Sequence, residues 1–239
     1  ANTLMDMINK KKLRAIILCG GEGSRLRPLT NKIPKPLVKI NSKPILGYLL
    51  EHLEQSSIDE YYIATGYRSK KIEEYFKINK KLKKKVTIIN SGNVDIVMRI
   101  KECIKHFNRK DDFMVFYGDT LSNIRVNNIV RFHKTHKGLA SIAIWRLRST
   151  FGLMNSDTKN KIVSYKEKPI LDSWINIGYF YFSSNLIDVI KKYRKFERFL
   201  SYLIKSNLMY GYKHKGLHYT VNTEEELNKL TRNIHRLAK

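Results

Sequence analysis

The segment LCGGEGSRLRPLT, from Leu18 to Thr30, restricts the fold most strongly, because it continues a short apolar run at 14–18. Such a run, ended by glycines, predicts a buried strand. The three glycines that follow allow the backbone to approach an anion closely and to turn its N–H groups toward it. Arg25 adds a planar fork of donors that suits phosphate oxygens. These residues predict a strand that ends in an anion-binding loop, and the alternative is a tight turn with a surface arginine.

A rigid tripeptide, Pro34-Lys35-Pro36, comes shortly after this loop. The two prolines stiffen the backbone and so aim the single ammonium group of Lys35 at a fixed point. The loop has neither the Gly-Lys-Ser/Thr ending of a P-loop nor the third glycine of the dinucleotide-binding fingerprint. The pattern therefore predicts a phosphate site of another kind.

Strands and helices alternate in the first half of the chain. Strands are predicted at 14–18, 61–65, 86–89 and 113–117, and helices at 45–53, at 70–76 behind a Ser69 cap, and at 96–107. Alternation of this kind predicts a mainly parallel sheet with helices on both faces, which is a three-layer α/β/α domain.

The pattern becomes mixed after Asp119. Helices are predicted at 127–137, 186–193, 197–207 and from Thr223 onward, and strands at 140–147, 151–154, 161–166 and 175–182. No linker, internal repeat or low-complexity tract interrupts the chain. We therefore expect an N-terminal extension over 1–12 and one domain over 13–239, with two lobes at about 13–119 and 120–239.

Composition indicates a globular protein. The chain has 239 residues, enough to bury roughly 70% of its unfolded surface, and 42% of them are hydrophobic. No apolar run approaches the roughly 20 residues of a membrane span. The first ten residues lack the order of a signal peptide, so a cytoplasmic location is expected. Cys19 and Cys103 have no His or Cys at metal-ligand spacing, which argues against a disulfide or zinc site.

The net charge is strongly positive. Lys and Arg number 46 against 21 Asp and Glu, a formal charge of +25 that would attract any polyanion. The lysines nevertheless spread along the whole chain, and no recognition motif accompanies them. We therefore expect no specific nucleic-acid partner, although a basic nucleic-acid-binding protein stays open as an alternative function.

The glycine loop together with Pro34-Lys35-Pro36 resembles the signature of the sugar-1-phosphate nucleotidyltransferases. The resemblance extends from Leu13 to about Leu230, and it is closest to the glucose-1-phosphate cytidylyltransferases. Five further matches support it: Gly66-Tyr67, Tyr117-Gly118-Asp119, Phe151-Gly152, Glu167-Lys168-Pro169 and Ile175-Asn176-x-Gly178.

The resemblance implies a Rossmann-like, mostly parallel mixed sheet and a transfer reaction. The nucleotidyl group of an NTP, with CTP favoured, would pass to a sugar 1-phosphate, with glucose 1-phosphate favoured, and pyrophosphate would leave. The product would be an NDP-sugar for surface polysaccharide synthesis, and homo-oligomer formation stays open. A sugar phosphate is already an anionic nucleophile, so the mechanism requires no general base but only positioning and charge neutralisation.

The resemblance also assigns roles to residues. Arg25, Lys35 and Asp119 would be catalytic. The NTP would be bound by Leu18, Gly20, Gly21, Gly23, Ser24, Arg25, Lys35, Ser91, Gly92 and Gly118. The sugar phosphate would be bound by Gly152, Glu167, Lys168 and Asn176, and Mg²⁺ by Asp119 and Asn222. Taken alone, Asp119 could instead cap a turn, and Glu167 with Lys168 could form a surface ion pair.

Two positions depart from the family. Asn222 stands where the family usually has an aspartate that binds metal, and an amide oxygen can bind Mg²⁺ only without net charge. Its alternative role is to cap the helix that opens at Thr223. The base-binding segment Asn90–Arg99 has one glycine and is shorter than the Gly-Gly-Arg run of the cytidylyltransferases. Guanylyl or thymidylyl transfer, or a catalytically weak sensor of nucleotide sugars, are therefore alternatives.

Overall fold

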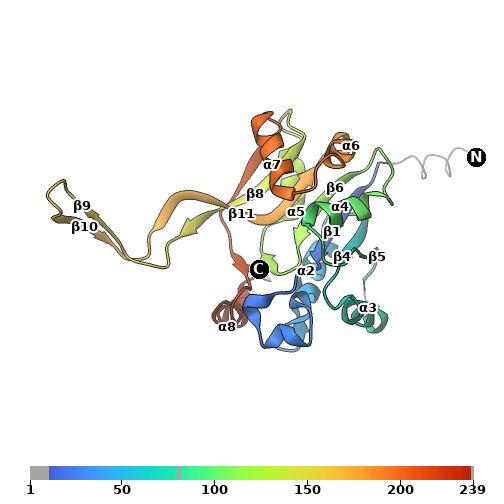
Figure 1. The fold of residues 1–239 in the computed structure, drawn as a ribbon, viewed down its shortest axis with the longest axis horizontal. Helices are drawn as coiled ribbons and strands as arrows, with labels where there is room; N and C mark the ends of the chain where they lie inside the picture. The colour runs from blue at the N-terminus through green and yellow to red at the C-terminus, as the bar shows by residue number, and fades with distance from the viewer. Residues whose placement is uncertain (1–10, 80–81, 238–239) are drawn as a thin grey trace, which may run out of the picture.

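The computed structural model describes residues 11–79 and 82–237, so most of the predicted N-terminal extension lies outside the described residues. Its main feature is a seven-stranded sheet in the order β12-β8-β11-β6-β1-β4-β5 (Figure 1). The strands are β1 (Leu13–Cys19), β4 (Glu60–Thr65), β5 (Lys85–Asn90), β6 (Asp112–Tyr117), β8 (Ala140–Arg148), β11 (Ile170–Phe182) and β12 (Met209–His214).

The sheet is mixed and mostly parallel. β1 is parallel to both of its neighbours, β4 and β6, and β4 is parallel to β5. β11 runs antiparallel to β6 and to β8, while β12 is parallel to β8. β11 is therefore the one reversed strand of the seven, and the sheet continues without a break across the predicted lobe boundary at 119.

Helices cover both faces, which confirms the predicted three-layer architecture. The apolar core on one face receives side chains from α2 (Ile45–Glu54), α3 (Ser69–Ile78), α5 (Val126–His133) and α8 (Glu224–Asn233). The core on the other face receives them from α4 (Ile96–Ile104), α6 (Ile187–Ile190) and α7 (Phe196–Lys205). The central strand β1 supplies both cores, with Ala15 and Ile17 on one face and Ile16 on the other. Burial on both faces explains why β1 reads as a continuous apolar run.

Three short strand pairs complete the structure. They are β2 (Lys39–Ile40) with β3 (Lys43–Pro44), β7 (Thr120–Ser122) with β13 (His218–Thr220), and β9 (Leu153–Ser156) with β10 (Ile162–Lys166). The β7–β13 pair matters most for the site. It joins the residues after Asp119 to the last part of the chain, and the amide of Val221 donates to the carbonyl of Asp119 over 3.2 Å.

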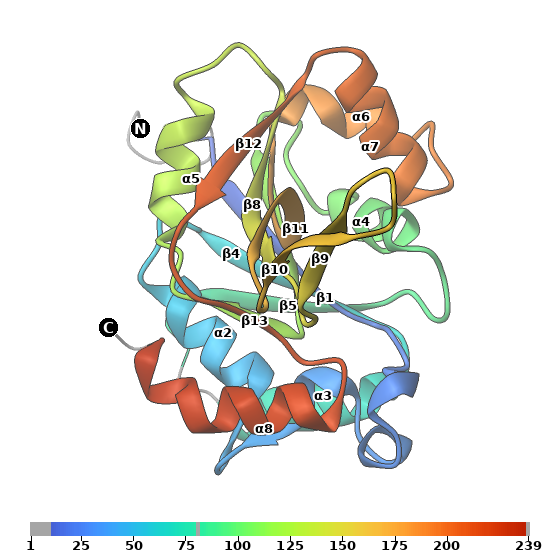
Figure 2. The ribbon, with the colours of Figure 1, turned by 90° about the vertical axis from the view of Figure 1, so that its left-hand side faces the viewer.

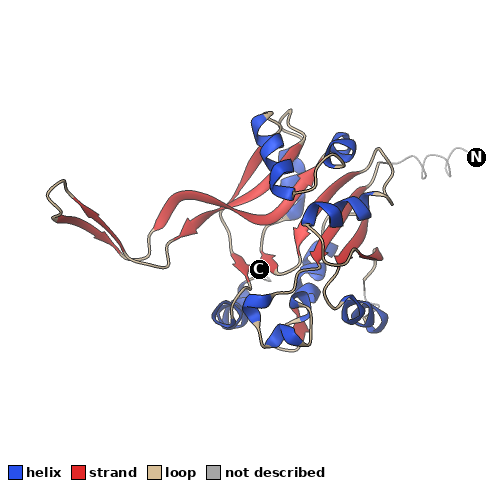
Figure 3. Cartoon of the chain, viewed as in Figure 1, coloured by secondary structure: helices blue, strands red, loops and turns tan. Residues whose placement is uncertain are grey.

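Residues 149–169 form an arm that projects from the body of the protein. β9 and β10 make a hairpin beyond the ends of β8 and β11, and Figures 1 and 3 show it extended away from the helices. Viewed end-on, as in Figure 2, the hairpin stands in front of β8 and β11. Its apolar side chains are unusually exposed, including Phe151 at 75% and Met154 at 63%. The sequence predicted these strands but not their projection from the domain.

Several predicted boundaries are wrong by a few residues. α4 ends at Ile104 and α5 at His133, three and four residues earlier than expected, whereas β11 begins five residues earlier. Ser69 does not cap α3, because it is the first residue of the helix and Arg68 stands before it in the left-handed region with φ 49°. None of the helices among the described residues is long and apolar enough to cross a bilayer.

Thr223 begins α8 through a capping box, in which its hydroxyl accepts from the amide of Glu226 and the Glu226 carboxylate accepts from the amide of Thr223, both over 3.2 Å. Thr223→Ala should lower the free energy of unfolding by about 1 kcal/mol, since a helix amide loses its partner. Thr223→Asn should retain the stability of the wild type. Urea denaturation measures both variants, and an alanine variant as stable as the wild type would show that the cap contributes nothing.

Candidate active site

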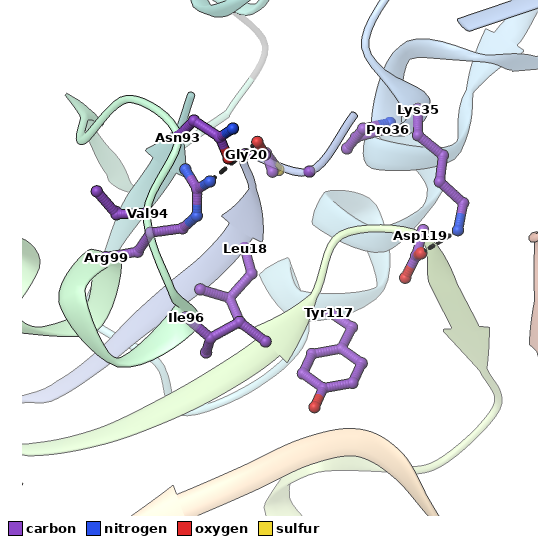
Figure 4. A pocket seen from close by; sticks show the side chains of 12 residues that line it. Leu18, Gly20, Lys35, Pro36, Asn93, Val94, Ile96, Arg99, Tyr117 and Asp119 are labelled. Carbon is purple, nitrogen blue, oxygen red and sulfur yellow. Dashed lines mark hydrogen bonds and ion pairs between the residues drawn. The ribbon is translucent and has the colours of Figure 1, made fainter. Parts of the chain in front are cut away.

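A pocket of about 370 Å³ opens at the carboxyl ends of β1 and β6. Such edges are where open α/β sheets bind ligands. Its floor includes Leu18, the next-to-last residue of β1, and Tyr117, the last residue of β6. Figure 4 shows Lys35 and Asp119 on one side of this floor and Arg99 on the other. The pocket therefore has cations on two opposite sides, Lys35 and Arg99.

Lys35 is held by a short 3₁₀ turn, Lys35–Leu37, that follows the extended backbone of Pro34. Its side chain is only 11% exposed. The ammonium group donates to the carboxylate of Asp119 and, over 2.9 Å, to Oδ1 of Asn222. The structure thus holds this one cation in a fixed place, and its partner Asp119 lies just after the end of β6.

Asn222 accepts a second hydrogen bond to the same Oδ1, from the guanidinium of Arg25 over 2.9 Å. One amide oxygen therefore joins the two predicted catalytic cations. Since Thr223 caps α8 with its own hydroxyl, the alternative that Asn222 serves as the helix cap is wrong. The structure brings together Arg25, Lys35, Asp119 and Asn222, which we call the charge cluster.

The glycine loop lies beside this cluster. Gly23 has φ +62°, and an added Cβ would approach Cβ of Lys35 to 3.0 Å, so glycine is needed both for the turn and for the close approach. The hydroxyl of Thr30 donates to the Gly23 carbonyl over 2.9 Å and closes the loop. Ser24 and Arg25 follow in a 3₁₀ turn, Ser24–Leu26.

The remaining residues predicted to bind NTP take different positions. Gly20 and Gly21 line the pocket with Leu18, and the amide of Gly118 donates to the Leu18 carbonyl over 3.1 Å. Ser91 and Gly92 do not line the pocket; they lead into the segment that does, which contributes Asn93, Val94 and Ile96.

The residues predicted to bind the sugar phosphate are divided between the pocket and the arm. Asn176, on β11, donates through Nδ2 to the hydroxyl of the pocket residue Tyr117 over 3.4 Å. Gly152, Glu167 and Lys168 lie on the exposed arm. There the Lys168 ammonium is 3.9 Å from the Glu167 carboxylate, in a surface ion pair. In this conformation only Asn176 is next to the pocket.

Several pocket residues received no individual role from the sequence, among them Tyr117 and Arg99. Tyr117 is half-buried on the floor, and Arg99, from α4, is 5% exposed and forms part of the wall. The position of Arg99 in the base-binding segment was visible in the sequence. The sequence did not indicate that Arg99 is buried, because its burial depends on contacts with residues far away in the chain.

Two titratable side chains in or near the pocket, Cys19 and His218, are held neutral. Burial, and then the charge of Asp119, raises the pKa of the Cys19 thiol well above its usual range. Burial and the nearby His214 lower the pKa of His218 to about 4, so its imidazole is uncharged at neutral pH. At neutral pH the Cys19 thiol therefore supplies no thiolate nucleophile, and the His218 imidazole supplies no positive charge.

Asp119 and Asn222 offer a carboxylate and an amide oxygen, both of them hard donors that Mg²⁺ accepts. No group of three or more His, Cys, Asp or Glu side chains at metal-binding spacing occurs in the part of the chain that the structure describes. A divalent ion held here would therefore take its other ligands from water and from substrate phosphates, which is how Mg²⁺ is usually bound by enzymes that act on NTPs.

Comparison with known proteins shows the family to which the chain belongs. The sequence model of the family described as nucleotidyl transferase matches residues 14–225, which is most of the chain. The chain belongs to the nucleotidyl transferase family. The predicted class of enzyme, a nucleotidyltransferase, is thereby confirmed, and members of this family generally use a divalent metal.

Relatives of this nucleotidyl transferase carry several substrate names. A UTP–glucose-1-phosphate uridylyltransferase of Synechocystis sp. is 30% identical over 205 residues, which cover 77% of the chain and 53% of that relative. A Bacillus subtilis protein named "Probable glucose-1-phosphate cytidylyltransferase" is 29% identical over 240 residues, 90% of the chain and 93% of the relative. The chain thus spans about half the length of the first relative and nearly all of the second.

Solved structures confirm the fold. HddC from Yersinia pseudotuberculosis aligns with a TM-score of 0.72 at 23% identity, covering 92% of this chain and 99% of HddC. A UDP-glucose pyrophosphorylase complexed with UDP-glucose aligns with a TM-score of 0.73 at 16% identity, covering 95% and 99%. At these identities the likeness supports the architecture of the nucleotidyl transferase and not a particular substrate.

Lys35→Ala should abolish most of the turnover while leaving the fold intact. Removing one donor that stabilises transition-state charge costs about 3–4 kcal/mol, or roughly 100- to 1000-fold in kcat. Lys39→Ala, which removes an exposed lysine four residues later, is the matched control and should keep the wild-type rate. A well-folded Lys35→Ala enzyme with near-normal kcat would remove Lys35 from the mechanism.

Proposed function

We propose that this chain is a sugar-1-phosphate nucleotidyltransferase that uses CTP and glucose 1-phosphate, releases pyrophosphate and acts in the cytoplasm in surface polysaccharide synthesis. The observation that carries the proposal is the charge cluster at the mouth of the pocket. Arg25 and Lys35, two cations, converge on Asn222, and Lys35 also pairs with Asp119. A triphosphate is the ligand that such an arrangement beside a glycine loop fits best.

The preference for CTP rests on relatedness. The Bacillus subtilis relative named for cytidylyl transfer aligns over 93% of its own length, which leaves little of it without a counterpart here. Guanylyl transfer is the second candidate, because HddC of similar fold has been solved in complex with GMP-PN. Thymidylyl transfer remains a third, and a weak sensor of nucleotide sugars would lack turnover with every substrate pair.

In the proposed reaction, an oxygen of the sugar phosphate attacks the α-phosphorus in line with the departing pyrophosphate. That oxygen forms the new P–O bond, and the bond to the β-phosphate breaks with its electron pair on pyrophosphate. Arg25 and Lys35 neutralise charge on the triphosphate and on its leaving group. Mg²⁺, when bound at Asp119 and Asn222, would supply further charge neutralisation. No residue has to remove a proton, because the attacking oxygen is already ionised.

The acceptor subsite involves the arm. Asn176 lies next to the pocket, because it donates a hydrogen bond to the pocket residue Tyr117. Gly152, Glu167 and Lys168 lie on the arm, outside the pocket. For all four residues to bind the sugar phosphate, as we propose, the arm has to approach the pocket when the acceptor binds. The exposed apolar side chains of β9 and β10 favour such a movement, because it would remove them from water.

A substrate screen tests the proposed function. CTP, UTP, GTP and dTTP are each combined with a panel of sugar 1-phosphates in the presence of Mg²⁺, and pyrophosphate release is measured. The proposal expects release that depends on both substrates and is fastest with CTP and glucose 1-phosphate. Release with another base or sugar would keep the reaction and correct the substrates, and no release with any pair would contradict the proposed function.

Lys168→Ala should raise KM for the sugar phosphate and leave KM for the NTP within experimental error. A hydrogen bond to a charged group contributes about 1.5–3 kcal/mol, so the increase should be roughly 10- to 100-fold. Lys161→Ala, another exposed lysine of the arm, serves as the control. If KM rises for the NTP alone, the assignment of the two subsites is wrong.

A further inference from the structure

Arg99 is a buried cation without a carboxylate partner. Its side chain lines the pocket from α4 at 5% exposure. The guanidinium donates to the carbonyl of Thr65 over 2.9 Å and to that of Gly20 over 3.1 Å. No ion pair of Arg99 occurs among the described residues. A buried charge is costly to desolvate, so these two carbonyls and the open pocket are its compensation.

The two carbonyls belong to neighbouring strand ends. Gly20 follows β1, and Thr65 is the last residue of β4. Each carbonyl accepts a second bond from a loop amide, Tyr67 to Gly20 and Ser91 to Thr65, both over 3.1 Å. The guanidinium therefore fastens the start of the glycine loop to the end of β4 and to the segment that forms the opposite wall of the pocket.

A side chain at the neighbouring glycines would collide with this guanidinium in its present position. An added Cβ at Gly20 would lie 1.8 Å from Nη1 of Arg99, and the three nearest atoms to it all belong to that side chain. At Gly66, an added Cβ would lie 2.4 Å from the same Nη1. The absence of side chains at these positions leaves the space that the guanidinium occupies.

Tyr67, which follows the end of β4, contacts both ends of the glycine loop. The hydroxyl of Tyr67 donates to the carbonyl of Thr30 over 2.9 Å, while its amide bonds Gly20. Both ends of the loop thus contact the residues at the end of β4, which pairs with β1 as far as Cys19 and Thr65, and Arg99 extends this connection to Gly20.

We propose that Arg99 is a positioning residue for the nucleotide: it locks the ends of β1 and β4 and so holds the glycine loop in the shape that binds the triphosphate. It would act on NTP binding and not on acceptor binding, since the acceptor residues lie on β11 and on the arm. The kinetic part of this proposal rests on the proposed function, whereas its structural part does not.

A double-mutant cycle tests the structural part without any substrate. Gly20→Ala, Arg99→Ala and the double variant are compared with the wild type by thermal unfolding. Because the added methyl group collides with the guanidinium, Gly20→Ala should lower Tm by several degrees in the wild type and by much less in the Arg99→Ala chain. Equal losses of Tm in the two backgrounds would overturn the proposed lock.

Kinetics and calorimetry test the positioning role, with Arg14 as the matched control. Arg14 is also buried, but it pairs with Asp111 and Glu60 at the opposite end of β1. Arg99→Ala should raise KM and Kd for the NTP about tenfold or more and leave KM for the sugar phosphate unchanged, since displacing a binding loop weakens only its own ligand. Millimolar guanidinium ion should restore part of the affinity by entering the vacated space.

Arg14→Ala should lower Tm, keep both KM values and show no rescue by guanidinium. If Arg99→Ala fails to fold, Arg99→Lys is used, because a lysine cannot bond both carbonyls in the same plane. Unchanged NTP affinity in a folded Arg99 variant would overturn the proposal. Calorimetric Kd values keep this outcome separate from the failure of the proposed function, in which no substrate pair would release pyrophosphate.

Discussion

The buried ammonium group of Lys35 is the constraint on which the site depends. A charge that is only 11% exposed has to be paired, and its partners here come from two distant parts of the chain, Asp119 and Asn222. The first stands at the end of β6. The second reaches the same place only because β13 pairs with β7 and the Val221 amide bonds the Asp119 carbonyl. The β7–β13 pair thus brings the C-terminal segment to the cation that Asn222 helps to pair.

The charges of the cluster favour an anionic ligand. Arg25 and Lys35 bring two positive charges, and Asp119 brings one negative charge, while Asn222 contributes only a dipole. The amide keeps a net positive site that joins the cations through one oxygen, which suits a reaction whose main difficulty is to hold two anions together.

Local signals predict much of the fold, whereas the resemblance to the family is what named the four residues of the charge cluster. The apolar run of β1, the glycines after it and the prolines beside Lys35 each specify local backbone geometry. Arg99 could not be placed, since its bonds to Gly20 and Thr65 span 79 and 34 residues. The projection of the arm could not be predicted either, because the apolar residues of β9 and β10 are typical of strands within a packed sheet.

Asn222→Asp gives the most direct test of the central claim, that Lys35, Asp119 and Asn222 form one electrostatic centre for a metal-bound triphosphate. The measurement is the Mg²⁺ concentration for half-maximal activity, with Asn228→Asp on the exposed face of α8 as the control. A carboxylate adds a full charge to which hard Mg²⁺ responds. The account predicts a lower Mg²⁺ requirement with kcat kept or raised for Asn222→Asp alone. An Asn222→Asp titration identical to that of the wild type would contradict it.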